Sequence, residues 1–247
     1  MSGARFSQQL MTYGGGGLVA VTGPLQTDDS TQGDTTYQFT VDIGAYSPTR
    51  RVFLCIHWSE GSTHYILDAA SCTIDGGAWD TGDVIQVGHS GGSTGFGAAL
   101  LSATPTGSGN VTVHLDFDGS GDAVSGVSIY PIVVYGLTQS NVDNEDTDEN
   151  VGTAFGLSDN VVVTGPNAVV IAVYTGSTNT KNTAVSWVGL TEIYDTQGPI
   201  DPDDPSDPIR ISAAMDINLD SDASLTVQAN ITPIADSGNG FVIQSWH

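Results

Sequence analysis

A short apolar run, Val52 to Trp58, constrains the fold more than any other stretch of this chain. It follows the pair Arg50 and Arg51, and it is rich in β-branched and aromatic residues at consecutive positions. That pattern is typical of a strand buried on both faces inside a sandwich or barrel. Two similar runs follow, at Val127 to Leu137 and Ala168 to Tyr174. We expect the three runs to meet in one core, because no strand can bury both of its faces alone.

The rest of the chain has the composition of strands and turns. Its 247 residues include 31 Gly and 10 Pro, which favour turns, and no stretch keeps the apolar spacing of an amphipathic helix. Strand candidates recur roughly every 8–15 residues, which indicates a sandwich or barrel. Long connections at 141–150 and 198–208 favour Greek-key or jelly-roll crossings. We therefore predict an all-β fold, an antiparallel β-sandwich of jelly-roll-like topology.

Several local predictions accompany this fold. Residues 141–150 are expected to form a solvated acidic loop. Residues 161–163 and 168–174 are expected to form a hairpin, and a tail is expected after a last strand at 225–231. Clean alternation over residues 37–43 predicts a strand with one wet face, which buries Tyr37, Phe39, Val41 and Ile43.

The N-terminus is predicted to be an extended arm. Residues 1–17 end in a run of glycines, Gly14 to Gly17, which is a flexible hinge, and residues 18–247 are expected to form a single β-sandwich domain. An arm of this kind often becomes ordered only when it lies on a partner; a frayed terminus is the alternative. Its expected docking residues are Arg5, Phe6, Leu10 and Tyr13.

The charge balance excludes two classes of partner. Lys and Arg total 5 against 28 Asp and Glu, which gives a formal net charge of −23. Nucleic acids and anionic membrane surfaces are bound through Lys and Arg, so neither is expected to bind this chain. The same charge keeps copies of a protein soluble and apart.

The N-terminal residues lack the apolar core of a signal peptide, and no run approaches the roughly 20 apolar residues of a membrane span. We therefore expect the protein to be made and folded in the cytoplasm. In that reducing compartment Cys55 and Cys72 are expected to be buried free thiols, with a disulfide between them as the alternative.

One motif resembles catalytic chemistry but lacks its context. Gly88 to Gly92 matches the G-x-S-x-G nucleophile elbow, with Ser90 at the centre. The elbow needs a helix after the serine, and residues 93–97 cannot start one. Histidines also lack metal-site spacing and are expected in the core or on the surface; they are His57, His64, His89, His114 and His247. We expect no enzyme activity and no cofactor other than a calcium ion.

The candidate calcium ligands are Asp116, Asp118 and Asp122, three carboxylates spaced i, i+2 and i+6 among glycines. A polar turn between strands is the simpler interpretation of the same residues. Trp79 lies in a turn and is the expected exposed aromatic for stacking on sugar rings. Trp58 and Trp187 lie in predicted strands, where core packing is expected.

A family resemblance rests on five short segments. In chain order they are Arg-Arg-Val-Phe-Leu (50–54), Thr-Ile-Asp-Gly-Gly (73–77), Gly-Val-Ser-Ile-Tyr-Pro (126–131), Val-Ser-Trp-Val-Gly-Leu-Thr-Glu (185–192) and Ile-Ser-Ala-Ala (211–214). This order, over residues 35–231, resembles a β-rich module of tailed-bacteriophage virion proteins. The resemblance implies a jelly-roll-like sandwich used as a structural or adhesive unit, without catalytic residues.

The expected function is therefore that of a non-enzymatic virion structural protein. It would be displayed on the particle surface, as a capsid decoration or cement protein or as a tail-fibre or spike subunit. It would dock through its arm to other virion proteins of the capsid or tail, and analogy suggests a homo-oligomer, a trimer. The alternative is a lectin-like module that binds cell-surface glycans through Trp79, assisted by calcium at Asp116 to Asp122.

Overall fold

The computed structural model describes residues 10–12, 17–29, 34–60, 65–87, 95–119, 124–138, 144–150, 156–177, 184–199, 209–232 and 239–247. Within these ranges the regular elements are β-strands, and the strands pair antiparallel. No helix among the described residues is long and apolar enough to span a membrane. The prediction of an all-β, antiparallel fold is confirmed.

The first part of the chain, here called the N half, forms two sheets. The N-inner sheet contains, in spatial order, β1 (Leu10–Thr12), β2 (Val19–Thr22), β12 (Val124–Tyr135), β5 (Arg50–Glu60), β10 (Gly95–Ala103) and β9 (Thr81–Val87), with β3 (Gln26–Asp28) beside β12. The N-outer sheet contains β4 (Thr36–Asp42), β11 (Asn110–Gly119), β7 (Thr73–Ile74) and β8 (Gly77–Ala78), with β6 (Tyr65–Leu67) beside β11.

The remainder, the C half, also forms two sheets. The C-inner sheet has the order β13 (Asn144–Asn150), β20 (Asn239–Trp246), β15 (Ala168–Ser177), β18 (Ile209–Leu219) and β17 (Glu192–Gln197). The C-outer sheet has the order β14 (Gly156–Val163), β19 (Asp222–Thr232) and β16 (Ala184–Val188).

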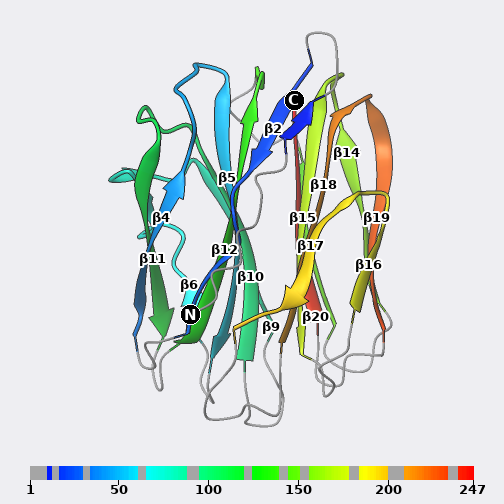
Figure 1. Ribbon diagram of the computed structural model, residues 1–247. Helices are drawn as coiled ribbons and strands as arrows, with labels where there is room; N and C mark the ends of the chain where they lie inside the picture. Colours follow the sequence, from blue (N-terminus) through cyan, green and yellow to red (C-terminus); the bar gives the residue numbers. More distant parts are fainter. Residues whose placement is uncertain are drawn as a thin grey trace.

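The four sheets stack as layers, with the two inner sheets face to face (Figure 1). Apolar side chains fill each of the three spaces between neighbouring layers. In β5, Ile56 and Trp58 point towards the N-outer sheet, while Phe53 and Cys55 point towards the C-inner sheet. The prediction of a strand buried on both faces is therefore confirmed, and its physical cause is a sheet covered on both sides. Strand β12 lies beside β5 in the N-inner sheet, and β15 lies in the C-inner sheet.

Both halves have the same strand order. If β13 to β20 are counted from first to eighth, the C-inner sheet runs first, eighth, third, sixth, fifth, and the C-outer sheet runs second, seventh, fourth. The N half repeats this order when β2 and β3 count as its first strand and β6 to β8 as its fourth. The middle strands also have corresponding neighbours: Trp58 of β5 lies between Gly97 of β10 and Val127 of β12, and Tyr174 of β15 lies between Ser212 of β18 and Phe241 of β20. The chain contains one strand topology twice.

Several local predictions are confirmed. Strand β4 alternates between buried and exposed residues, with Tyr37, Phe39 and Val41 inward. Cys55 and Cys72 are both buried and free.

Three local predictions are wrong. Residues Asn144–Asn150, predicted as a loop, form the edge strand β13, because the backbone can pair with β20 without apolar side chains. The expected hairpin does not form, since β14 pairs with β19 while β15 pairs with β18 and β20. The expected tail is β20, a fully buried strand inside the C-inner sheet.

Strand β20 was predicted as a tail because polar residues lie near its end. Gln244 and Ser245 are buried but find backbone acceptors: Gln244 Nε2 donates to Leu100 O at 3.2 Å, and Ser245 Oγ donates to Val162 O at 2.7 Å. A buried strand can contain such residues when their hydrogen bonds are made.

Candidate functional site

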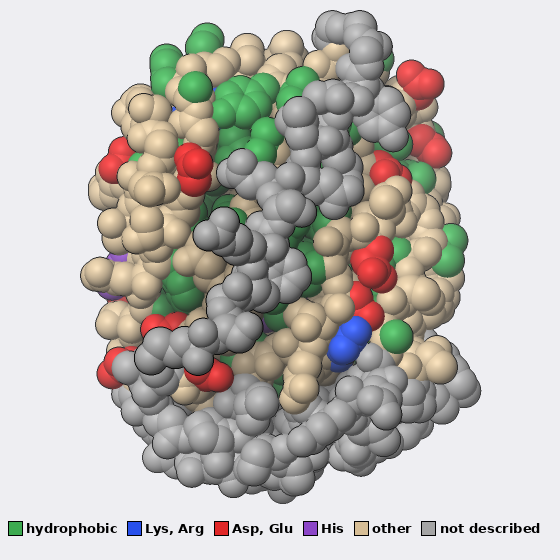
Figure 2. All heavy atoms as spheres, viewed as in Figure 1, with side chains coloured by type: hydrophobic (Ala, Val, Ile, Leu, Met, Phe, Trp, Pro, Cys, Tyr) green, Lys and Arg blue, Asp and Glu red, His purple; other side chains and the backbone are tan. Residues whose placement is uncertain are grey.

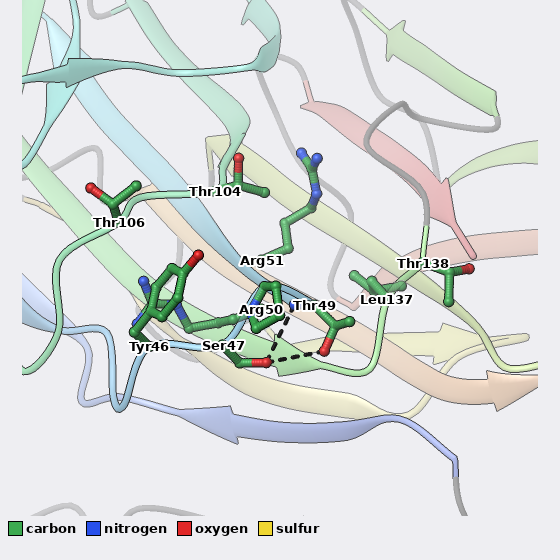
Figure 3. Close-up of a pocket in the computed structure, with 10 residues that line it drawn as sticks. Tyr46, Ser47, Thr49, Arg50, Arg51, Thr104, Thr106, Leu137 and Thr138 are labelled. Atoms are coloured by element: carbon green, nitrogen blue, oxygen red, sulfur yellow. Dashed lines mark hydrogen bonds between the residues drawn. The ribbon is translucent and has the colours of Figure 1, made fainter.

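A pocket of about 300 Å³ lies at the end of the N half where β5 begins (Figure 3). Three separate connections build it: the turn before β5, the segment after β10 and the segment after β12. Its walls are formed by Tyr46, Ser47, Pro48, Thr49, Arg50, Arg51, Thr104, Thr106, Leu137 and Thr138. The lining combines hydroxyl groups with one aromatic ring, and both arginines lie at the start of β5.

The turn before β5 holds the aromatic ring and part of the hydroxyl lining. Ser47 Oγ and Thr49 Oγ1 are 3.1 Å apart, and Thr49 N donates to Ser47 Oγ at 3.3 Å. Tyr46 is 56% exposed, and its ring centroid lies 5.8 Å from the guanidinium carbon of Arg50. An exposed ring beside hydroxyl groups fits a neutral polar ligand.

Arg50 supports the pocket from beneath. It is 2% exposed, and its Nη1 donates to Ile43 O at 3.1 Å and to Gly44 O at 3.3 Å. Its Nη2 donates to Gly107 O at 2.9 Å and to Pro105 O. The guanidinium thus joins two turns through four carbonyl groups, so these donors are occupied within the fold. Arg50 is a structural brace of the pocket.

Arg51 joins the two halves. Its Nη1 lies 3.4 Å from Asp80 Oδ2 and donates to Ser102 Oγ at 3.0 Å. Its guanidinium carbon lies 4.2 Å from the ring centroid of Trp246 in β20. Burial lowers the pKa of Arg51, and the Asp80 carboxylate opposes that effect. Asp80 is thus the acidic partner of Arg51 at the start of β5.

A buried histidine crosses the layer between the halves. His57 is fully buried on β5, and its Nε2 lies 2.5 Å from the hydroxyl oxygen of Tyr194 on β17. The ring of Tyr194 in turn lies 4.6 Å from that of Tyr130. Burial lowers the pKa of His57 to about 3 and raises the pKa of Tyr194 well above its usual value. The pair is neutral, and His57 is a core histidine, as the sequence allowed.

A side-chain amide also fixes the C half on the N half. Leu18 N donates to Asn218 Oδ1 at 2.5 Å, and Asn218 Nδ2 donates to Leu18 O at 3.1 Å. The amide therefore satisfies both backbone groups of one residue. Together with the His57–Tyr194 contact, these bonds set the position of one half against the other.

The middle strands of the two halves each bury a large aromatic residue, in different surroundings. Trp58 fills its end of the N half and packs edge-on against Phe117 at 5.5 Å between centroids. A Cβ at position 97 would lie 1.9 Å from the Trp58 ring, so only glycine fits there. Tyr174 of β15 is buried, and within the described part of the chain its hydroxyl makes no hydrogen bond. The amide of Asn239 is likewise buried without a partner among the described residues.

The predicted aromatic sites lie closer to the core than expected. Trp79 follows β8 and is half-buried against the core of the N half, with no hydrogen-bond partner for its Nε1 among the described residues. Trp58 is fully buried, as predicted. Trp187 is half-buried, and its Nε1 donates to Ser212 Oγ at 2.8 Å. Sugar stacking by Trp79 stays a prediction.

The predicted calcium ligands are not all in a loop. Asp116 and Asp118 belong to β11, where they pair with Thr36 and Ile66. Asp122 lies outside the described residues. The described residues contain no group of three or more His, Cys, Asp or Glu side chains that could hold a metal ion. Calcium binding by all three aspartates stays a prediction.

The structure describes part of the predicted arm. Leu10 begins β1, and its Cα partner is Val21 of β2. Arg5, Phe6 and Tyr13 lie outside the described residues, so docking by the arm stays a prediction. Ser90, His64 and His89 also lie outside them.

The other two histidines are described. His114 is half-buried on β11, and His247 Nδ1 lies 3.1 Å from Thr164 Oγ1.

No protein-family model matches this chain, and no curated protein matches it significantly.

Proposed function

We propose that this chain is a non-enzymatic structural protein of a tailed-phage particle, displayed on the particle surface. The observation that carries the proposal is the repeated strand order. In each half the inner sheet follows first, eighth, third, sixth, and the outer sheet follows second, seventh, fourth. That order supports a jelly roll in each half, with the fifth strand moved to the edge of the inner sheet. Jelly rolls occur in viral capsid domains, and the step from fold to function here is an analogy.

The use of the buried polar groups supports a structural role. Arg50 binds carbonyl groups of neighbouring turns, Arg51 stacks on Trp246, and His57 binds Tyr194 across the layer between the halves. Each contact joins separate parts of the fold. Such contacts favour a rigid unit that displays its surfaces in fixed positions.

We propose docking to other virion proteins through the arm, residues 1–17, as a capsid decoration protein or a tail-fibre subunit. The pairing of Leu10–Thr12 with β2 supports this, because these three residues form the edge strand of the N-inner sheet. A homo-oligomer, a trimer by analogy, suits such positions.

Immunogold labelling tests the location. Antibodies raised against the folded chain are applied to particles released from the source culture, and labelled capsids or tails are expected. Label confined to the unassembled fraction would overturn the proposal. A variant that lacks residues 1–17 is expected to fold, as judged by circular dichroism, and to be missing from purified particles. Normal incorporation of that variant would remove the arm from the proposal.

The pocket supports a second candidate, a glycan-binding module. Its exposed Tyr46 ring and threonine hydroxyls match the needs of a neutral sugar, and jelly rolls also occur in lectins. A glycan array tests this with the wild type, Tyr46→Ala and Trp79→Ala. Loss of signal in Tyr46→Ala alone assigns the sugar to the pocket, and loss in Trp79→Ala assigns it to the predicted stacking residue. A wild type without signal removes this candidate.

A further inference from the structure

The C-outer sheet has an outward face without charged side chains over most of its area. Strand β19 lies in its middle, flanked by β14 and β16. Side chains that alternate away from the core form this face. They are Ser158, Asn160 and Val162 of β14, Ser224, Thr226, Gln228, Asn230 and Thr232 of β19, and Ala184, Ser186 and Val188 of β16. We call this set the neutral face; Asp222 lies at its end.

The hydrogen bonds on the neutral face run between its own side chains. Thr226 Oγ1 donates to Asn160 Oδ1 at 2.7 Å, and Gln228 Nε2 donates to Asn230 Oδ1 at 2.7 Å. The remaining hydroxyl and amide groups provide both donors and acceptors. Val162 and Val188 add exposed apolar area at 38% and 51% exposure. A surface of this kind has the groups to form hydrogen bonds and apolar contacts with a copy of itself.

The matching face of the N half provides an internal comparison. Its outward side chains are also rich in threonine and amides, with Gln38, Thr40 and Thr112 among them. That face also carries acids, Asp42 at one end and Asp118 at the other. The strand topology is the same, so the difference in charge lies in the sequence of each outer sheet.

Charge decides which surfaces of this chain can meet. Two copies, each with a formal net charge of −23, repel one another, and acids are scattered over the side of the molecule shown in Figure 2. A contact between acidic surfaces would bring like charges together and desolvate them. The neutral face avoids both penalties. We propose that it binds the neutral face of a second copy, which gives a symmetric dimer with the N-outer sheets outermost.

The size of the face sets the strength of this dimer. Adjacent strands lie ~4.8 Å apart and outward residues along one strand ~6.8 Å apart, so the face covers roughly 400 Å². A standard stable interface buries ~800 Å² on each partner. The dimer is therefore weak and concentration-dependent. Added salt strengthens it, because the screening length falls from ~10 Å at 0.1 M to ~3 Å at 1 M.

Sedimentation velocity on the purified full chain tests the proposal over a range of protein and NaCl concentrations. The wild type is expected to shift from monomer to dimer as either concentration rises. The double variant Thr226→Glu, Gln228→Glu places acids at the centre of the face and is expected to raise the dimer dissociation constant by about tenfold or more.

The matched control, Gln38→Glu with Thr112→Glu, adds the same charge to the N-outer sheet and is expected to associate like the wild type. Thermal unfolding followed by circular dichroism checks that each variant is folded. A wild type that stays monomeric throughout would overturn the proposal, because the neutral face would then not bind a second copy. Equal association of both double variants, or equal loss in both, would also overturn it. The result does not depend on whether the chain belongs to a particle.

Discussion

Acid is expected to destabilise the fold through His57. Burial lowers the pKa of His57 to about 3 in the folded chain, from 6.5 for an ordinary histidine. Between these values the unfolded chain binds a proton at His57 that the folded chain does not bind, so stability is lost as the pH falls below 6.5. At about 1.36 kcal/mol per pKa unit, the loss is about 2 kcal/mol at pH 5 and about 3 kcal/mol at pH 4.

The carboxylates of this acidic chain also titrate in this range, so the effect is measured against His57→Gln. Glutamine can keep a hydrogen bond to the Tyr194 hydroxyl and does not titrate. The free energy of unfolding is measured in urea, by tryptophan fluorescence, at several pH values between 7.5 and 4. The wild type is expected to lose about 3 kcal/mol relative to the variant over this range. His114→Gln, at a half-buried position on β11, is the matched control for the replacement of a histidine. Parallel curves for wild type and His57→Gln would refute the argument.

Three further predictions concern buried side chains. Trp246→Ala removes a ring that packs on Phe53 and Arg51 and is expected to lower the free energy of unfolding by about 3–5 kcal/mol in urea titrations; a loss below about 1 kcal/mol would contradict its place in the core. Tyr174→Phe removes a buried hydroxyl without a described partner, so it is expected to stabilise the fold by about 1 kcal/mol in the same assay; clear destabilisation would mean that the hydroxyl is bonded. Burial raises the pKa of Cys72 to about 11 and that of Cys55 above its usual range, so neither thiol should react with a disulfide reagent at pH 8 until guanidinium is added; rapid labelling of the folded chain would contradict their burial.

Local patterns predicted the elements that are decided locally. The apolar run at Val52 to Trp58 and the alternation at 37–43 report which faces of a strand are buried, and both predictions are confirmed. Asp75-Gly76 is a local turn sequence of the same kind: both residues have positive φ values, 51° and 74°, and join β7 to β8. In each case, residues that are neighbours in the sequence determine the burial pattern or the turn.

Elements decided by distant partners were not predicted. Strand β13 is held by backbone pairing to β20, which lies near the other end of the C half. The repeat of strand order is visible only once the strand pairings are known. Sequence periodicity does not contain this information.

The pocket was not predicted, for the same reason. The sequence placed Arg50 and Arg51 at the start of a strand, but the pocket also needs Thr104, Thr106 and Thr138 from two other connections. Likewise, His57 meets Tyr194 from 137 positions away, and Leu18 meets Asn218 from 200 positions away. Nothing in the local sequence of either partner indicates the other. A detectable sequence repeat between the halves would have predicted the repeated strand order.

The acidic residues are distributed unevenly between the β13 edge and the neutral face. Strand β13 is an edge of the C-inner sheet, and four of its seven residues, Glu145, Asp146, Asp148 and Glu149, are acids. Edge strands expose unpaired backbone groups and can pair with other chains, and charge on an edge opposes such pairing. The neutral face has little charge. The middle strand of its sheet, β19, pairs with β14 on one side and with β16 on the other. Charge therefore disfavours strand addition at the β13 edge, and it does not oppose face-to-face contact through the neutral face. That selection follows from where the acids lie in the sequence, and it predicts that salt promotes a defined dimer rather than open-ended aggregation.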